Sequence, residues 1–218
     1  MILIVSRSTG MSSTVSEIFM TMGYVTECVS PERAATVLSF RHHGVLVLGR
    51  RACADSAEFV AELRAVRGPV PIFSVRDDLS ADAYRYFDGV YPNSVYSAGI
   101  VGDLIRLANK RGQAPIGEYR TGALRAEVGR REVTLGGVPL GLTKTESGIV
   151  RYLICMDPTA VRARDVLSHA FKSARMPTEA GVRTHISAIN RKTQAVCGRP
   201  LIASEGGYRL AVSEMATV

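Results

Sequence analysis

Short apolar runs alternate with helix-patterned segments along the first half of this 218-residue chain. The run Val45-Leu46-Val47-Leu48 is typical of a strand inside a parallel sheet, because such a strand is covered on both faces. Shorter runs of the same character are Ile2–Val5, Tyr24–Val29, Val70–Val75 and Gly89–Tyr91. Five strands spaced in this way predict that helices connect them.

Apolar residues at helical spacing fill the intervals between these runs. The expected helices cover Val15–Met22, a segment opened by Ser30-Pro31-Glu32, Phe59–Val66, Ala81–Phe87 and Ile100–Lys110. Five βα units in about 110 residues predict an α/β domain, a doubly wound five-stranded parallel sheet with helices on both faces.

The segment Lys110–Gly117 breaks this pattern, because it is polar and holds two glycines and a proline. We therefore expect domains at 1–110 and 121–218, with a linker at 111–120. Short strands follow at Leu124–Val128, Glu132–Leu135 and Val138–Leu142.

Three helices and a hairpin complete the second domain. Thr143-Lys144-Thr145-Glu146 has the pattern of a capping box at the start of the first helix. The second and third helices cover about Ala163–Phe171 and Glu179–Thr193. Strand-like segments at Pro200–Ala203 and Tyr208–Val212 then enclose Ser204-Glu205-Gly206-Gly207.

Positive charge is concentrated in this second part of the chain. Up to Gly117 there are 12 Lys and Arg against 11 Asp and Glu, whereas from Glu118 onward there are 15 against 9. The whole chain carries a net charge of +7. An excess of this kind on one domain favours a nucleic-acid partner.

The third helix has an apolar back and a polar front. Val182, Ile186 and Ile189 share one stripe, and Arg183, Ser187, Asn190 and Arg191 lie largely away from it. Arg, Asn and Ser side chains can hydrogen-bond base edges in the major groove. An ordinary solvated face is the alternative for the helix alone, but the Gly-rich hairpin that follows favours a winged helix-turn-helix, an α+β domain.

Three motifs resemble the effector domain of the OmpR/PhoB family of response regulators. Leu142–Glu146 resembles its L-T-x-x-E opening, Val182–Lys192 its V-D-V-H-I-S-R-L-R-R-K recognition helix, and Gly206–Leu210 its G-x-G-Y-R-L wing. The motifs occur in the right order over about ninety residues. The resemblance implies a transcription regulator that binds double-stranded DNA, with RNA polymerase as a candidate partner. Because no apolar run has the length of a membrane span and Ile2–Val5 is too short for a signal peptide, we expect a cytoplasmic protein.

The resemblance also gives roles to matching residues. His185 matches a phosphate-contacting histidine, Tyr208 the wing tyrosine, and Arg191 and Lys192 the basic run at the helix end; structural or surface roles are the alternatives for His185 and Tyr208. Arg183, Ala188 and the short wing beginning at Ser204 depart from the motifs, so the DNA sequence cannot be carried over. The predicted DNA-contacting set is Arg183, Thr184, His185, Ser187, Ala188, Asn190, Arg191, Lys192, Ser204, Gly206 and Tyr208.

The first domain resembles a receiver domain in pattern but lacks its phosphorylation residues. Ser6 and Arg7 stand where an acidic pair would hold Mg²⁺, which requires oxygen ligands. Leu48 or Gly49, followed by Arg50-Arg51, stands at the position of the aspartate nucleophile, and Ser94 at that of the lysine. Of the residues that a working receiver uses, only the hydroxyl residue at the fourth strand is retained, as Ser74. This degenerate site predicts a receiver that works without phosphorylation.

Receivers of this family dimerise through one face, which implies a homodimer here. The matching residues are Arg85, Asp88, Asp103 and Arg106, whose charges could pair across a two-fold axis or simply be solvated. An alternative function is a sensor whose degenerate pocket, with Arg7, Ser74, Arg50 and Arg51, binds a small anion or a partner. Phosphotransfer is a distant third reading. We expect no metal, cofactor, catalysis or membrane association, because the sequence shows no motif for them.

Overall fold

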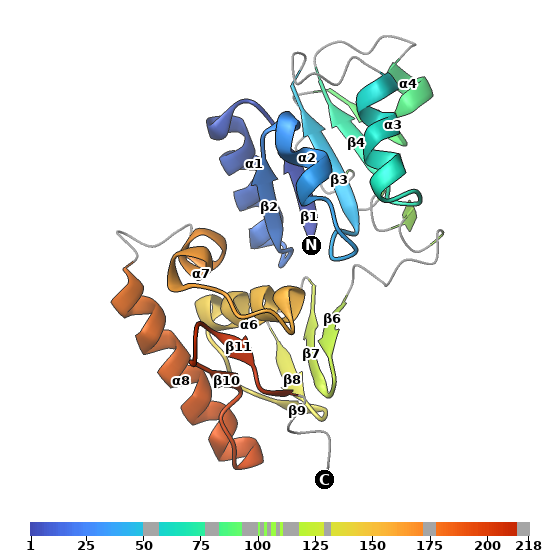
Figure 1. Ribbon diagram of the computed structural model, residues 1–218. Helices are drawn as coiled ribbons and strands as arrows, with labels where there is room; N and C mark the ends of the chain where they lie inside the picture. The colour runs from blue at the N-terminus through green and yellow to red at the C-terminus, as the bar shows by residue number, and fades with distance from the viewer. Residues whose placement is uncertain are drawn as a thin grey trace. The chain divides into compact units, whose positions relative to one another are not determined.

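The computed structural model describes residues 1–49, 57–76, 83–92, 100, 103, 106–107, 110, 118–128, 132–171 and 178–212. The chain divides into two compact units, Met1–Ile116 and Gly117–Val218 (Figure 1). Each unit is described by itself below.

The first unit is built on a parallel sheet. Its strands are β1 (Ile2–Val5), β2 (Thr26–Val29), β3 (Gly44–Leu48), β4 (Ile72–Val75) and β5 (Gly89–Tyr91). Their order in the sheet is β2-β1-β3-β4-β5, and every neighbouring pair is parallel. This order confirms the doubly wound receiver-like sheet that the sequence predicts.

Helices α1 (Thr9–Thr21), α2 (Pro31–Val37), α3 (Ala57–Val66) and α4 (Ala83–Tyr86) accompany the sheet (Figure 1). Helices α2 and α3 bury their apolar sides in one cluster with strands β1, β3 and β4, formed among others by Ala34, Leu63, Val47 and Ile72. Every residue of β3 is buried, as its unbroken apolar run predicts. The predicted helix from Ile100 to Lys110 lies largely outside the described residues.

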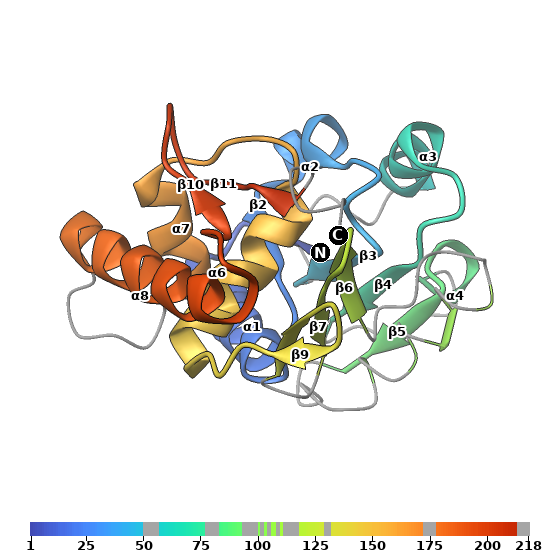
Figure 2. The same ribbon diagram turned by 90° about the horizontal axis from the view of Figure 1, so that it is seen from below.

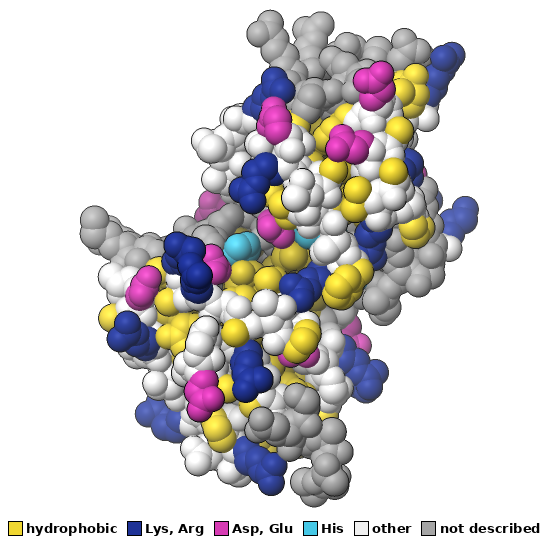
Figure 3. All heavy atoms as spheres, in the orientation of Figure 1, with side chains coloured by type: hydrophobic (Ala, Val, Ile, Leu, Met, Phe, Trp, Pro, Cys, Tyr) yellow, Lys and Arg dark blue, Asp and Glu magenta, His cyan; other side chains and the backbone are white. Residues whose placement is uncertain are grey.

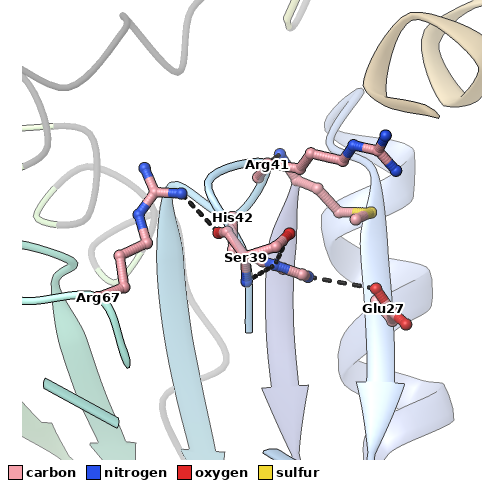
Figure 4. Close-up of polar contacts among 6 residues, drawn as sticks. Glu27, Ser39, Arg41, His42 and Arg67 are labelled. Atoms are coloured by element: carbon pink, nitrogen blue, oxygen red, sulfur yellow. Dashed lines mark hydrogen bonds and ion pairs between the residues drawn. The ribbon is translucent and has the colours of Figure 1, made fainter. Parts of the chain in front are cut away.

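A polar cluster lies at the amino-terminal end of this sheet (Figure 4). His42, only 1% exposed, accepts a hydrogen bond at Nδ1 from the backbone N–H of Ser39 at 3.1 Å. Its Nε2 lies 3.2 Å from the Glu27 carboxylate, and Arg67 donates to the carbonyl of Ser39. Because Nδ1 accepts from a backbone donor, Nε2 carries the ring proton and donates to Glu27. The cluster thus joins the loop after α2 to β2 and to the end of α3.

Replacing His42 by alanine should destabilise the first unit by about 2–4 kcal/mol, because a cavity forms and the partly buried Ser39 N–H loses its acceptor. Phe40, in the same loop, is 75% exposed, so Phe40→Ala is the matched control and should change stability by less than about 1 kcal/mol. Chemical denaturation measures both. Equal stabilities of the two variants would refute the structural role of His42.

The second unit opens with an antiparallel sheet in the order β6-β7-β8-β9. Its strands are β6 (Glu118–Thr121), β7 (Leu124–Glu127), β8 (Val133–Leu135) and β9 (Val138–Pro139). Strand β6 corrects the predicted linker, which extended to residue 120. Its buried Tyr119 is flanked by charged Glu118 and Arg120, so the strand has one apolar residue and its sequence looks like a polar connection.

Three helices and a hairpin follow: α6 (Lys144–Met156), α7 (Ala163–Ala170), α8 (Glu179–Cys197), β10 (Ile202–Ala203) and β11 (Arg209–Leu210). The predicted capping box of α6 is confirmed, since Glu146 accepts from Thr143 N at 2.7 Å and Thr143 Oγ1 from Glu146 N at 3.3 Å. Helix α8 extends beyond the predicted end at Thr193 and stops at Gly198, whose φ of +74° suits glycine. Both views show the hairpin beside α8 (Figures 1 and 2). This is the predicted winged helix-turn-helix arrangement.

None of the helices in the described part of the chain combines the length and apolar character needed to span a bilayer.

Candidate DNA-binding surface

Helix α8 presents one polar face and buries the other. Its start is fixed by Thr178, whose side chain accepts from the backbone N–H of Gly181 at 3.1 Å. Val182, Ile186 and Ile189 are at most 3% exposed, as the predicted apolar stripe requires. The exposed side chains are those of Arg183, Thr184, Ser187 and Arg191, which lie on the opposite face because an α-helix turns by about 100° per residue.

A hollow of about 580 Å³ runs between α8, the start of α7 and the hairpin. Its lining residues are Arg162, Ala163, Arg183, Ile186, Ser187, Ser204, Gly206, Gly207 and Tyr208. Five of the predicted DNA-contacting residues, Arg183, Ser187, Ser204, Gly206 and Tyr208, therefore meet in one place. Helix face and wing form a single concave surface.

The base of the wing is tied to the segment that precedes α7. Val161 and Tyr208 exchange two backbone hydrogen bonds, of 2.8 and 2.9 Å. Between them and the wing tip, Gly207 has a φ of +134°, and a Cβ there would lie 2.9 Å from the carbonyl oxygen of Val161. Only glycine fits this close approach without strain, so the wing's path past α7 depends on it.

Arg162 is a residue of this surface that the sequence did not indicate. It precedes α7 and is exposed, and its backbone N–H donates to the Asp165 carboxylate at 3.2 Å. Its side chain lines the same hollow as Arg183. The two arginines bring positive charge to this part of the surface, which favours anions such as phosphate. The sequence signal that could have indicated Arg162 is a basic residue at the start of a helix, but this feature is common in proteins.

Basic side chains are spread over the face that carries α7, α8 and the hairpin, with acidic ones interspersed (Figure 3). Arg183 and Arg191 are exposed on α8, and Arg209 is exposed on β11. These side chains supply the kind of positive field that a nucleic acid requires.

Asn190, which the sequence predicts to contact DNA, is partly buried and is bonded within the protein. Its Nδ2 donates to the carbonyl of Ile202 at 2.8 Å, and its Oδ1 accepts from the backbone N–H of Ile202 at 2.8 Å. Both ends of the amide are thus engaged with strand β10. The OmpR/PhoB motif has arginine at this position, so Asn190 is a further departure from it.

Lys192, which the sequence also predicts to contact DNA, is likewise bonded within the protein. Its ammonium lies 2.7 Å from the Glu146 carboxylate and donates to the carbonyl of Gly141 at 2.9 Å. Glu146 is only 4% exposed, so the lysine neutralises a buried charge at the start of α6. Lys192 stabilises the packing of α8 against α6 instead of contributing a free charge.

The remaining predicted residues of α8 differ in their exposure and in their contacts within the protein. The ring of His185 is partly buried and packs edge-on against Phe171, with ring centroids 5.2 Å apart. Thr184 donates its hydroxyl to the carbonyl of Ala180 within the helix. Ala188 is partly buried, and Arg191 is exposed.

The described residues at the degenerate phosphorylation positions of the first unit each make contacts of their own. Arg7 is exposed and pairs with Glu32 at 2.8 Å, and Leu48 is a buried apolar residue. Ser74 lies within β4, as the predicted strand Val70–Val75 requires, beside Val47 and Val90, and is 2% exposed.

Other residues near the strand ends complete this description. Ser6 is 8% exposed and its hydroxyl accepts from Ser8 N, and Gly49 has a φ of +93°. Arg76, which the sequence analysis did not include among the residues of this site, follows β4 and is only 5% exposed. Arg50, Arg51 and Ser94 lie outside the described residues. Within the described ranges, no cluster of His, Cys, Asp and Glu side chains is arranged to hold a metal ion.

The predicted dimer-contact residues make contacts inside the chain. Asp88 accepts from Ile72 N at 2.7 Å and from Arg64 at 3.1 Å, and its side chain is 10% exposed. Asp103 accepts from the hydroxyl of Tyr91 and pairs with Arg106 at 2.9 Å. Asp88 is thereby corrected to an internal residue that holds the start of β5, while Arg85 and Arg106 are exposed.

No protein-family model and no curated protein matches the chain. Solved structures do align with it over most of its length. A redox sensor of streptococci, from a family described as evolved from two-component response regulators, is 15% identical and aligns over 96% of this chain and 97% of its own, with a TM-score of 0.42.

Two further structures belong to response regulators. DrrB of Thermotoga maritima, an OmpR/PhoB homologue, is 18% identical over 96% of this chain and 97% of its own, with a TM-score of 0.41. The DNA-binding domain of CpxR from E. coli is 25% identical over 43% of this chain and 94% of its own, with a TM-score of 0.36. Because these TM-scores are below 0.5, the fold assignment rests on the strand order and helix arrangement of each unit. The solved structures similar to this chain thus include OmpR/PhoB-type response regulators, the family that its sequence motifs resemble.

Proposed function

We propose that this chain is a sequence-specific DNA-binding transcription regulator whose second unit binds DNA through α8 and the hairpin β10–β11. The observation that supports this most is the shared hollow, in which Arg162 and Arg183 meet Ser187 and the wing residues. An exposed helix face beside a hairpin and flanked by guanidinium groups fits the major groove and the adjoining phosphates.

Each group has a distinct task in this proposal. Arg183 and Ser187, exposed near the start of α8, face base edges, and the Arg183 guanidinium suits the two acceptors of guanine. Arg162 contacts the phosphate backbone from the start of α7. The wing, from Ser204 to Tyr208, contacts the neighbouring backbone. Arg191 adds attraction that is independent of sequence.

The first unit acts without phosphorylation in this proposal. The positions of the acidic pair and the nucleophile hold Ser6, Arg7, Leu48 and Gly49, and none of these side chains is a carboxylate. A phosphoryl group therefore lacks both its acceptor and the oxygen ligands for Mg²⁺.

Incubation with acetyl phosphate and Mg²⁺ should leave the mass of the protein unchanged. Its affinity for DNA should change by less than about twofold. Intact-protein mass spectrometry and a binding titration on the same sample measure the two quantities. An added phosphoryl mass together with tighter DNA binding would overturn phosphorylation independence.

We further propose that the chain binds DNA as a homodimer, which the family resemblance supports. Two copies of 23.5 kDa would place their α8 helices in successive major grooves, about one helical turn apart. Sedimentation with and without DNA measures the mass of the complex. RNA polymerase stays a predicted partner. The two described residues of the alternative anion-sensing pocket do not support it, since Arg7 pairs with Glu32 and Ser74 is buried within β4.

Selection of bound duplexes from random DNA by the full chain tests sequence specificity. The expected result is enrichment of one short motif, repeated at the spacing of a helical turn. Arg183→Ala should relax the preference at one position of that motif, and Arg191→Ala should leave the motif unchanged while lowering affinity. A recovered pool that is as random as the starting pool would contradict sequence-specific binding.

A further inference from the structure

We propose that Asn190 and Thr193 lock the hairpin onto α8, so that the DNA-reading helix and the wing act as one rigid unit. This inference rests on the proposed DNA-binding function for its consequence, although the lock itself is a property of the free protein. Asn190 is a positioning residue in this proposal, because it acts on DNA through the wing.

The contacts of the lock join one side of α8 to the first strand of the hairpin. The Asn190 amide exchanges two hydrogen bonds of 2.8 Å with the peptide groups of Ile202, as a neighbouring strand would. One turn later, Thr193 Oγ1 accepts from Leu201 N at 3.2 Å. Leu201, Ile202 and Thr193 are at most 2% exposed and Asn190 is partly buried, so the Thr193 bond is shielded from water and the two Asn190 bonds are partly shielded.

The lock explains why this position holds asparagine. An amide carries both a donor and an acceptor, so it can satisfy the N–H and the carbonyl of Ile202 together. Arginine, which the family motif has here, carries donors only and cannot accept from the Ile202 N–H. The chain therefore lacks one positive charge on α8 and has in its place a fixed connection to the wing.

The hairpin is held from two sides. Its first strand is bonded to α8 through Asn190 and Thr193, and Tyr208 at the start of its return is bonded to Val161 before α7. The wing therefore has its position relative to the exposed face of α8 before DNA binds. Less conformational entropy is lost on DNA binding than with a wing that is not held in place, so the off-rate of the complex is lower.

Hydrogen exchange in the free protein tests the lock without DNA. Asn190→Ala should speed exchange of the Ile202 amide at least about tenfold, because its acceptor is gone. Asn190→Asp retains that acceptor and should keep much of the protection. Gln194→Ala, at an exposed position of the same helix, is the matched control and should change nothing at Ile202. Unchanged exchange in Asn190→Ala would overturn the lock, whether or not the protein binds DNA.

A double-mutant cycle with Tyr208→Ala tests the consequence for DNA. If Asn190 acts through the wing, Asn190→Ala weakens DNA binding about tenfold, mainly by raising the off-rate, and has little further effect once Tyr208 is replaced. If Asn190 reads a base itself, the two losses multiply, and that result would overturn the proposal. Failure of the unmodified protein to bind DNA would instead contradict the proposed function, and the exchange experiment would still decide the lock.

Discussion

Replacing both Arg162 and Arg183 by alanine should weaken DNA binding by roughly 30- to 100-fold near physiological salt. The two residues line one hollow from different elements, α8 and the segment before α7, so we expect them to contact one stretch of DNA together. The plot of log affinity against log salt has a negative slope, and each lost phosphate contact makes it less steep by about 0.9. The double variant should therefore have a slope that is less steep by between about 1 and 2. The smaller change is expected if Arg183 contacts a base instead of a phosphate.

Arg120 and Arg125 provide a control with the same change of charge. They lie on the outer face of the β6–β9 sheet, where they line a different hollow. Arg120→Ala with Arg125→Ala should reduce affinity by less than about threefold, since only long-range attraction is lost. Fluorescence anisotropy on one labelled duplex measures both double variants. Equal losses would show that binding depends on overall charge and would contradict the assigned surface.

Replacing Glu146 by alanine should lower the free energy of unfolding of the second unit by about 3 kcal/mol. The carboxylate caps α6 through Thr143 N at 2.7 Å and pairs with Lys192 at 2.7 Å while 5% of its side chain is exposed. Removing one partner of such a buried pair leaves the other uncompensated. Glu179→Ala, in the exposed first turn of α8, is the matched control, with an expected loss below about 1 kcal/mol.

The Glu146 contribution should also depend on pH. Burial alone would raise the pKa of this carboxyl, but hydrogen bonds from Lys192 and from the backbone of Thr143 outweigh it and lower the pKa. The stabilisation is therefore present above the unfolded pKa of about 4.3 and is lost as the pH falls through the lower folded value. The difference in stability between the natural protein and Glu146→Gln should shrink below about pH 4. A difference that stays constant through this range would contradict the paired carboxylate.

The sequence predicted the architecture well where burial imposes a period. The apolar run of β3 and the stripe of Val182, Ile186 and Ile189 follow directly from which faces are covered. Strand β6 was missed because only Tyr119 among its residues is buried, and a single apolar residue sets no period.

The candidate DNA-binding surface could be predicted only in part, because side chains of one helix face have different neighbours. Asn190 and Lys192 lie on α8 beside candidate base readers, yet they bond to Ile202 and Glu146, which are distant in sequence. Helical spacing gives no information about such partners. Arg162 was missed for the converse reason, since it joins the surface only when the wing folds back past Val161.

Salt dependence of DNA binding tests the central claim most directly. With the full chain and a duplex recovered by selection, affinity should fall by about 100-fold between roughly 50 and 200 mM salt, linearly on a double-logarithmic scale, because bound phosphates release counterions. Absence of binding, or an affinity that does not change over this range, would contradict the account of α8 and the hairpin as a DNA-binding surface.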